Sequence, residues 1–378
     1  MLNLSERNNL GALNLITSAI GAALGVLVPL YMLQKGFGIA EIGIIFAVFP
    51  LVFLVLRTIF AGIADVIGTR RIFVLNGMSS IASVLTYAVA NSAHMFALGQ
   101  VLDGVRASAF WAVNRTEAYR IGNGEERKIA TIMLGLRGVG EFIGRIGIGA
   151  AIIYLGFTNS LAALSILSLA LIYFAFRVKN ENGQKLDISS VIRQFKERKA
   201  SAFIPGAIVV GISSLSYDAP FALLLPVFFA QKAGMSALEI GAMLGVFSII
   251  SAITTLGAVK KKIDLKWITI GTIIGASVPF FLIDYVDKQM LFPLILVVAA
   301  GYGLKGNLFE AVVQKSVRES KAVSTDIAVL HIPYRFGEIA VFAGLGIIAS
   351  QFGYALAFAF IGVTSIIYAV AAYMFVKE

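Results

Sequence analysis

The sequence predicts an all-α membrane protein whose twelve transmembrane helices form two six-helix bundles related by pseudo-two-fold symmetry. Three observations lead to this fold class: the composition, a series of twelve apolar stretches, and an internal repeat. Hydrophobic residues make up 58% of the chain, and the 37 glycines raise the apolar share to about 68%, against about 45–50% in soluble proteins. A soluble domain cannot bury so much apolar surface, so lipid must be part of the solvent.

Twelve apolar stretches follow one another along the chain, each long enough to cross a membrane. They cover residues 10–33, 40–64, 72–93, 94–119, 129–156, 158–176, 202–231, 238–259, 267–286, 290–314, 325–351 and 354–376. Asp, Glu, Lys and Arg are absent from the third, sixth, ninth and twelfth stretches over residues 72–93, 158–176, 267–283 and 354–376. Because a charge at mid-bilayer is costly, we expect these four spans to face lipid and the others to enclose a polar interior.

The net charge of +10 is distributed unevenly along the chain. Most Lys and Arg residues, such as Arg70 and Arg71, lie in the even-numbered connections or at the two termini, whereas Lys35, Lys232 and Lys288 lie in connections on the opposite side. This positive-inside asymmetry predicts a multi-pass protein of the cytoplasmic membrane with both termini in the cytoplasm. The basic character is therefore explained by orientation in the membrane, and no nucleic-acid partner is expected.

One long polar connection separates the two groups of six spans, which predicts an N-terminal bundle over residues 1–177 and a C-terminal bundle over 201–378. Between them, apolar residues from Ile188 to Phe195 recur at helical spacing among basic ones. This pattern is typical of a helix that lies on a membrane surface. The sequence therefore predicts a cytoplasmic linker over residues 178–200 with an amphipathic helix.

The two halves are copies of one another. At an offset of about 197–199 residues, four groups agree in order: Gln34-Lys35 with Gln231-Lys232, Glu41-Ile42-Gly43 with Glu239-Ile240-Gly241, Arg106 and Phe110 with Lys305 and Phe309, and Gly140-Glu141 with Gly337-Glu338. Six spans per copy is an even number, so both copies enter the membrane from the same side and the symmetry axis runs along the membrane normal. Two such bundles can rock about a site between them, which is the geometric basis of alternating access.

The connection after the second stretch, residues 61–71, reads AGIADVIGTRR. Its spacing of small residues, Asp65, Gly68, Arg70 and Arg71 resembles the signature of the major facilitator superfamily, with Val66 in place of the usual basic residue. The resemblance implies the fold of these transporters for the whole chain. It also implies that this loop forms a gate on the cytoplasmic side.

In that gate, Asp65, Gly68, Arg70 and Arg71 would act together with Glu117 or Glu126 as carboxylate partner. The alternative for the two arginines is a role in topology or in contacts with lipid headgroups. The Gly-rich fifth span further resembles the drug/proton antiporter branch of the superfamily, although that branch's Gly-Pro pair is missing.

Ionisable residues within the other spans are the candidate functional groups. At about 1.5 Å per residue, Arg106 and Glu141 each lie about 18 Å from one end of their spans, near the midplane where transporter sites are found. The candidate substrate ligands are Arg106, Arg137, Lys305 and Arg335. The candidate proton-coupling carboxylates are Asp103, Glu141, Asp218 and Glu338. The alternative is that these charges neutralise each other in pairs that hold the helices together.

These features predict a secondary transporter that moves a small amphipathic or anionic solute across the membrane, with proton-coupled export as the preferred form. The alternatives are a proton-coupled importer or a uniporter of a metabolite such as an organic acid or sugar, or a lipid flippase on the same scaffold. With no Cys, two His and no phosphate-cradling loop, we expect no metal, no cofactor and no ATP, and the proton gradient as energy source. No enzymatic activity is expected, and the expected partners are the substrate and membrane lipids around a monomer.

Overall fold

The computed structural model describes residues 4–122, 126–179, 201–318 and 323–377. Over these ranges the regular secondary structure is entirely helical. The amphipathic helix expected within the 178–200 linker lies outside the described residues.

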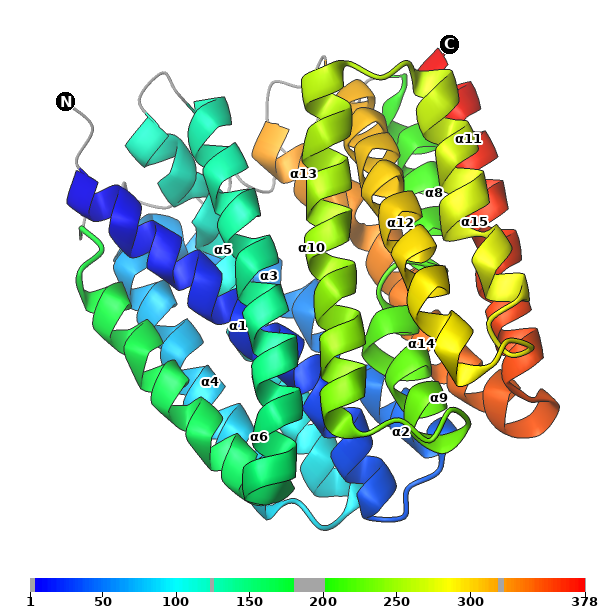
Figure 1. Cartoon of the computed structure of the whole chain (residues 1–378). Coiled ribbons are helices and arrows are strands. Elements are labelled where there is room, and N and C mark those ends of the chain that lie inside the picture. The colour runs from blue at the N-terminus through cyan, green and yellow to red at the C-terminus, as the bar shows by residue number, and fades with distance from the viewer. Residues whose placement is uncertain (1–3, 123–125, 180–200, 319–322, 378) are drawn as a thin grey trace. The chain divides into compact units, whose positions relative to one another are not determined.

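The first half of the chain folds into long helices that match the first six predicted spans (Figure 1). The helices are α1 (Leu4–Gln34), α2 (Ile39–Phe46), α3 (Val48–Ile67), α4 (Thr69–Val89), α5 (Ala93–Gly122) and α6 (Glu126–Phe176). Together α2 and α3 make the second span. α6 contains both the fifth and the sixth, which meet at Gly156, where a φ of 74° reverses the chain. Only glycine adopts that conformation without strain.

The second half contains more interruptions than the first. Its elements are α8 (Phe203–Ser214), the π-helical turn η1 (Pro220–Leu224), α9 (Leu225–Gln231), α10 (Ala237–Lys261), α11 (Leu265–Ala276), the 3-10 turn η2 (Val278–Phe281), α12 (Lys288–Val317), α13 (Val323–Leu330), α14 (Ile332–Phe352) and α15 (Tyr354–Lys377). The seventh span is thus α8, η1 and α9, the ninth is α11 and η2, and the eleventh is α13 and α14.

The predicted twelve-span, all-helical fold is confirmed. In the described part of the chain, eight helical segments are long and apolar enough to cross a membrane, and one of them, Ile132–Phe176, contains two predicted spans. The seventh and ninth spans are split into shorter apolar helices. α5 is long enough to cross as well, but it carries Asp103, Arg106, Arg115 and Glu117. Those charges make α5 the helix to examine for a functional site.

The chain forms two compact units. The first contains Met1–Phe37, Val48–Leu186 and Met235–Gly245, and the second contains Gly38–Ala47, Asp187–Gly234 and Val246–Glu378. The units follow the two halves of the sequence except for two short segments: α2 packs in the second unit, and the start of α10 packs in the first.

Glycines allow close helix contacts inside each unit. In the first unit, a Cβ at Gly140 of α6 would overlap the carbonyl of Leu15 in α1. In the second, a Cβ at Gly337 of α14 would overlap the Ser214 hydroxyl at the end of α8. Gly140 and Gly337 are equivalent in the sequence repeat, so the same small residue lets the fifth span of each half approach the first.

The two segments that pack in the unit formed mainly by the other half, α2 and the start of α10, are equivalent in the sequence repeat. In the second unit, Gly43 of α2 lies against the carbonyl of Phe342 in α14. In the first unit, Gly241 of α10 lies against the carbonyl of Arg145 in α6. Gly43 and Gly241 are equivalent in the repeat, and each lacks the space for a side chain. The duplicated sequence therefore produces duplicated backbone contacts.

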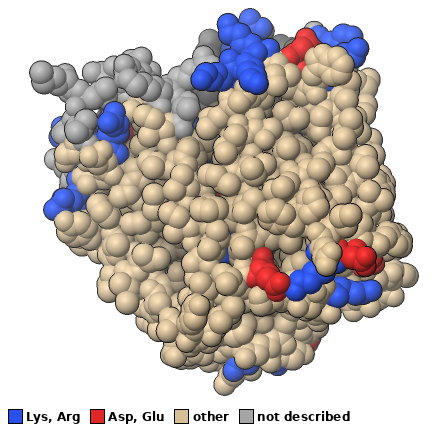
Figure 2. Space-filling view, in the orientation of Figure 1, with Lys and Arg blue, Asp and Glu red and all other residues tan. Residues whose placement is uncertain are grey.

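The surface has the character of a membrane protein. On the face drawn in Figure 2, the middle of the spans is free of Lys, Arg, Asp and Glu over most of its area, and charged residues gather toward the ends. Large apolar side chains are exposed on the spans predicted to face lipid, including Met78 of α4, Ile166 of α6, Ile274 of α11 and Met374 of α15. Such a surface is stable in contact with acyl chains and unstable in water.

Candidate transport site

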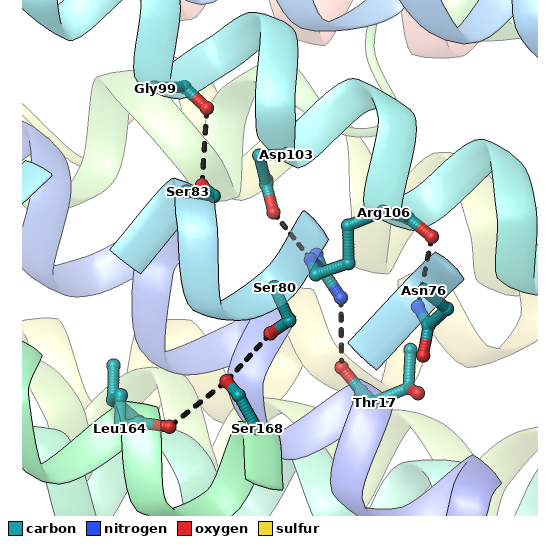
Figure 3. A network of polar contacts seen from close by, with 9 residues as sticks. All are labelled: Thr17, Asn76, Ser80, Ser83, Gly99, Asp103, Arg106, Leu164 and Ser168. Carbon is teal, nitrogen blue, oxygen red and sulfur yellow. Dashed lines mark hydrogen bonds and ion pairs between the residues drawn. The ribbon is translucent and has the colours of Figure 1, made fainter. Parts of the chain in front are cut away.

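The first unit contains a buried ion pair between two residues of α5. Arg106 Nε lies 2.5 Å from Asp103 Oδ1, and the two residues are 4% and 8% exposed. A spacing of three residues places both side chains on one face of the helix. Arg106 Nη1 also donates to the carbonyl oxygen of Thr17 in α1 over 3.4 Å, and Asn76 of α4 donates to the Arg106 carbonyl over 2.9 Å (Figure 3). The pair therefore joins α1, α4 and α5.

Further polar contacts surround this ion pair. Ser83 of α4 donates to the Gly99 carbonyl of α5 over 3.1 Å, and the hydroxyls of Ser80 and Ser168 lie 2.8 Å apart between α4 and α6 (Figure 3). The amides of Asn14 and Asn114 bond reciprocally between α1 and α5 at 2.8 and 3.1 Å. A helix bundle in lipid gains stability from such bonds, because apolar surfaces alone provide little association energy there.

In the second unit, Lys305 of α12 occupies the position that Arg106 occupies in the first. Its side chain is completely buried. The ammonium donates to the Ser216 carbonyl at 2.7 Å, the Ser216 hydroxyl at 2.8 Å and the Ser365 hydroxyl of α15 at 3.2 Å. Among the described residues, no carboxylate lies within ion-pair distance of Nζ. Oxygens of neutral groups therefore satisfy all three of its N–H bonds.

Tyrosine rings complete the surroundings of this ammonium. Nζ lies 4.7 Å from the centroid of Tyr302 and 5.6 Å from the centroids of Tyr217 and Tyr368. The electron-rich faces of such rings attract a cation, most strongly where water is excluded. We call Lys305, Ser216, Ser365 and these three tyrosines the lysine cage.

A break in the seventh span supplies the main acceptor of the lysine cage. α8 ends at Ser214, and regular α-helix resumes only at Leu225, after the π-helical turn that starts at Pro220. The break frees backbone carbonyls that a continuous helix would use, and at membrane depth these need other partners. The carbonyl of Ser216 accepts from the Tyr302 hydroxyl as well as from Lys305. Interrupted helices of this kind form the binding sites of many secondary transporters.

The two halves thus place an equivalent cation in the same geometry but surround it with different groups. In each, a cation on the fourth span reaches a backbone carbonyl of the first span: Arg106 reaches Thr17, and Lys305 reaches Ser216. At the repeat offset of 199 that aligns Arg106 with Lys305, Asp103 aligns with Tyr302. The carboxylate of the first half is therefore replaced by an aromatic ring in the second.

The break also positions Asp218 beside α14. Tyr334 donates its hydroxyl proton to Asp218 Oδ2 over 2.6 Å. The next residue, Arg335, forms an ion pair of 2.5 Å with Glu338, one turn further along α14, and Glu338 is 2% exposed. Asp218 and Arg335 are half-buried. Two carboxylates, a guanidinium and a tyrosine hydroxyl are thereby gathered where α14 passes the break.

Aromatic side chains surround these ionisable groups. The ring centroids of Tyr217 and Tyr334 lie 6.4 Å apart, and Phe309 lies 6.0 Å from each. His331, at the start of α14, lies 5.6 Å from Phe309 and donates its Nδ1–H to the Ile327 carbonyl. Aromatic faces beside hydrogen-bonding groups suit contact with a solute that has both apolar and polar parts.

Arg137, Glu141 and Arg145 are spaced by four residues along α6 and form a row of charges with separate partners. The Arg137 guanidinium stacks on Trp111 of α5 at 4.8 Å. Arg145 lies 4.0 Å from Glu141 and donates to the Leu244 carbonyl of α10 over 2.8 Å. The Glu141 side chain is 42% exposed, against 12% for Asp103 and 3% for Glu338. The row on α6 is therefore held by contacts of its own, which differ from those of the Asp103–Arg106 pair.

The predicted gate residues lie where α3 meets α4. Gly68 has a φ of 86° and precedes the first residue of α4, so the loop requires glycine at this position. Glu117 accepts from the Thr69 hydroxyl and from Arg120, which also contacts Glu6. In this conformation the expected partner of the gate arginines is thus held by other groups. The side chains of Asp65 and Glu126 lie outside the described residues.

Sequence reasoning identified the ionisable residues but missed their neutral partners. Ser216, Ser365, Tyr217 and Tyr302 were not among the candidates, although Tyr302 could have been found as the repeat equivalent of Asp103. The Asn14–Asn114 pair carries no sequence signal beyond two amides in apolar stretches. The structure brings Asp103 together with Arg106, and Asp218 into one neighbourhood with Arg335 and Glu338.

Comparisons with known proteins agree with this architecture. Residues 10–326 match the family model of the Major Facilitator Superfamily. The solved structure of the nucleoside transporter NupG is similar with a TM-score of 0.77 and 13% identity, covering 99% of each chain. A bacterial homologue of the human drug peptide transporters PepT1 and PepT2 is similar with a TM-score of 0.77 and 13% identity, covering 100% of this chain and 99% of that one.

No curated protein matches the sequence closely enough to count as a relative. At 13% identity the two solved structures establish the fold and carry no information about the solute. The family match covers most of the chain, however, and agrees with the twelve spans, the duplicated halves and the loop at residues 61–71. This chain is a multi-pass membrane protein that belongs to the major facilitator superfamily.

Proposed function

We propose that this protein is a secondary active transporter that exports a small amphipathic or anionic solute across the cytoplasmic membrane, in exchange for protons. Transport would proceed by alternating access. The coarser part of this statement, secondary transport, is supported by the family match and by the transporter structures with the same fold. Direction, coupling ion and solute are proposals.

The observation that carries the proposal is the gathering of ionisable groups at the interrupted seventh span. Asp218 bonds to Tyr334, Glu338 pairs with Arg335, and Lys305 bonds to the freed carbonyl of Ser216. Buried charges are costly in a membrane, and a bundle that needed only stability could replace them with apolar residues. We infer that their role is transport.

Proton coupling requires a carboxylate that exchanges partners. A carboxylate held by a cation stays ionised, whereas one that loses its cation in an apolar environment takes up a proton. We propose that Asp218 and Glu338 act in this way in the second unit, and Asp103 and Glu141 in the first. Arg335, Arg137 and Lys305 would contact an anionic group of the solute when they release their present partners, while Arg106 would hold the adjacent helices in register.

The experiment begins with a ligand, because the solute is unidentified. Purified protein is screened by thermal shift against metabolites and drugs at several pH values. The compound with the largest shift is then loaded with the protein into liposomes, and its flux is measured with and without an imposed pH gradient. The proposal predicts a flux that depends on the gradient and stops when an ionophore dissipates it.

Conservative variants test the carboxylates. Asp218→Asn and Glu338→Gln are expected to retain exchange of the compound at equal pH but to lose acceleration by the gradient. Glu141→Gln tests the first unit in the same way, as does Asp103→Asn combined with Arg106→Gln, because Asp103→Asn alone leaves Arg106 without its partner. Glu310→Gln on α12, whose side chain is exposed, is the matched control. Gradient-driven flux unchanged in all four variants would exclude these residues as proton carriers.

A further inference from the structure

A small open cavity lies at the end of the third span, where α4 begins. Its volume is about 300 Å³, and it is lined by Arg70, Arg71 and Val74 of α4 and by Phe176 at the end of α6. The Arg70 guanidinium lies 5.3 Å from the centroid of Phe176. Two guanidinium groups and two apolar side chains thus line one space, which suits a ligand with an anionic head and an apolar body.

The two arginines give this cavity an excess of positive charge. Among the described side chains, neither Arg70 nor Arg71 has a carboxylate within ion-pair distance. The nearby acid in α5, Glu117, is bound by Thr69 and Arg120. Guanidinium groups bind phosphate oxygens through paired N–H bonds, which makes adjacent arginines a typical phosphate site.

Apolar stripes lead from the cavity along two spans. On α6, Phe176 is followed at helical spacing by Tyr173, Leu169 and Ile166, which are 54%, 52%, 58% and 68% exposed. On α4, Val74 is followed one turn later by Met78, which is 58% exposed. The two helices pack closely, since a Cβ at Gly77 would overlap the Ile172 side chain. Residues three and four apart share a helix face, so each stripe is continuous.

We propose that this cavity binds the phosphate of an anionic phospholipid, with Arg70 and Arg71 on the phosphate and an acyl chain along the stripes of α4 and α6. A free phosphate would use the arginines but gain nothing from Val74, Phe176 and the exposed side chains beyond them. A lipid uses both parts of the surface. Basic residues at the ends of spans attract anionic headgroups at the same depth.

Native mass spectrometry of the detergent-solubilised full chain tests this proposal. The probes are dioleoylphosphatidylglycerol, glycerol 1-phosphate and inorganic phosphate, each titrated against the protein. We expect saturable binding of the diacyl lipid and none of the two chain-free phosphates over the same concentration range. Equal binding of glycerol 1-phosphate or inorganic phosphate would contradict a lipid site and indicate a site for soluble phosphates.

Variants locate the bound lipid. Arg70→Gln with Arg71→Gln should weaken binding by about fivefold for each guanidinium removed, whereas Lys260→Gln with Lys261→Gln at the end of α10 removes the same charge and should leave binding unchanged. Phe176→Ala should also weaken binding, in contrast to Phe352→Ala, which removes another exposed ring, at the end of α14. If the double variant does not purify as a monodisperse protein, Arg71→Gln alone replaces it and should weaken binding by about fivefold. Equal losses in a variant and its control would overturn the proposal.

Discussion

Lys305 and Arg106 occupy equivalent positions in the repeat, but their charges are balanced in different ways. Arg106 has a carboxylate partner 2.5 Å away. Lys305 has only hydroxyl and carbonyl oxygens and three tyrosine rings among the described groups around it. Replacing a buried ionic group by an apolar one of similar volume is often neutral or stabilising. In the first unit, loss of either partner would leave the other charge buried and unpaired, while the second unit retains a cation that stability alone does not require.

Lys305→Met is predicted to separate function from stability. Methionine fills most of the space of the lysine side chain and removes the ammonium, and the Ser216 carbonyl keeps its bond from Tyr302. We expect an unchanged or higher melting temperature and at least a tenfold loss of transport. Lys305→Ala is the control, because the empty space should lower stability by about 2–5 kcal/mol. Full transport by Lys305→Met would show that the cation has no role in it.

Asp103→Asn is predicted to be strongly destabilising. It leaves the Arg106 guanidinium buried without its carboxylate, a change that costs about 3–5 kcal/mol. The melting temperature of the purified protein in detergent measures the effect. If the ion pair is the cause, Arg106→Gln in the same chain should recover part of the loss, so that the two substitutions are not additive. Additive losses would mean that the two side chains act independently.

Among single residues, the ionisable groups could be predicted from the sequence, but most of their partners could not. Asp103 and Arg106 are three residues apart in one helix, so their pairing follows from helical spacing. The partner of Lys305 is the backbone carbonyl of Ser216, which is available only because the seventh span is broken there. No pattern of side chains reveals a free carbonyl. Glu117 was expected to be the carboxylate partner of the gate arginines, but in the structure it accepts from Thr69 and Arg120.

Among the helices, the packing of the first and fifth spans depends on the absence of side chains. Gly140 and its repeat equivalent Gly337 each lie directly against the first span of their half. At Gly147 and its equivalent Gly344, no described atom lies within 4 Å of the place where a Cβ would stand, so both face open space. The same helices therefore contain a tight and an open glycine seven residues apart.

Gly140→Ala is accordingly predicted to destabilise the protein, and Gly147→Ala to leave it unchanged or slightly more stable. The added methyl group at residue 140 overlaps the Leu15 carbonyl, and overpacking of this kind costs about 1–3 kcal/mol. Alanine at residue 147 removes only the flexibility of glycine. Melting temperatures of the two variants, with Gly337→Ala and Gly344→Ala as the second-half pair, test this. A larger loss at Gly147 than at Gly140 would contradict the packing of α1 on α6.

The number and order of the helices could be predicted because each span needs a long apolar stretch, and the charged connections mark its ends. The interruptions were harder to predict. Residues 215–219 contain neither glycine nor proline, and Pro220 indicates only that regular helix is disfavoured nearby. The break is stabilised by distant groups, Lys305 and Tyr302, whose contact with Ser216 depends on the tertiary fold.

For the whole molecule, the distribution of positive charge predicts the orientation in the membrane. Lys260 lies in a basic connection predicted to be cytoplasmic, and Lys232 in a connection on the opposite side. The chain contains no cysteine, so a single introduced thiol reports its own side of the membrane. Both lysines are exposed.

Lys232→Cys is predicted to react with a membrane-impermeant maleimide on intact cells. Lys260→Cys should react only after the membrane has been permeabilised, because the positive-inside rule places it in the cytoplasm. The two variants are each other's control for expression and thiol reactivity. The reverse labelling pattern would invert the topology and place both termini outside.

The family could be recognised from sequence because its signature lies in one loop, where Asp65, Gly68 and the two arginines keep their spacing. The solute could not. In the proposed function its identity depends on how Asp218, Tyr334 and Arg335 are arranged in space, and neither composition nor periodicity encodes that arrangement. The same fold carries nucleosides in one solved relative, so the fold alone leaves the solute open.

Proton movement that accompanies the solute tests the central proposal most directly. Liposomes containing the protein, a pH-sensitive dye and the compound identified by thermal shift are diluted into compound-free buffer of equal pH, with the membrane potential clamped. Proton exchange predicts that the lumen acidifies as the compound leaves, and that protein-free liposomes show no change. Alkalinisation would indicate co-transport with protons, and efflux without any change in lumenal pH would contradict proton coupling altogether.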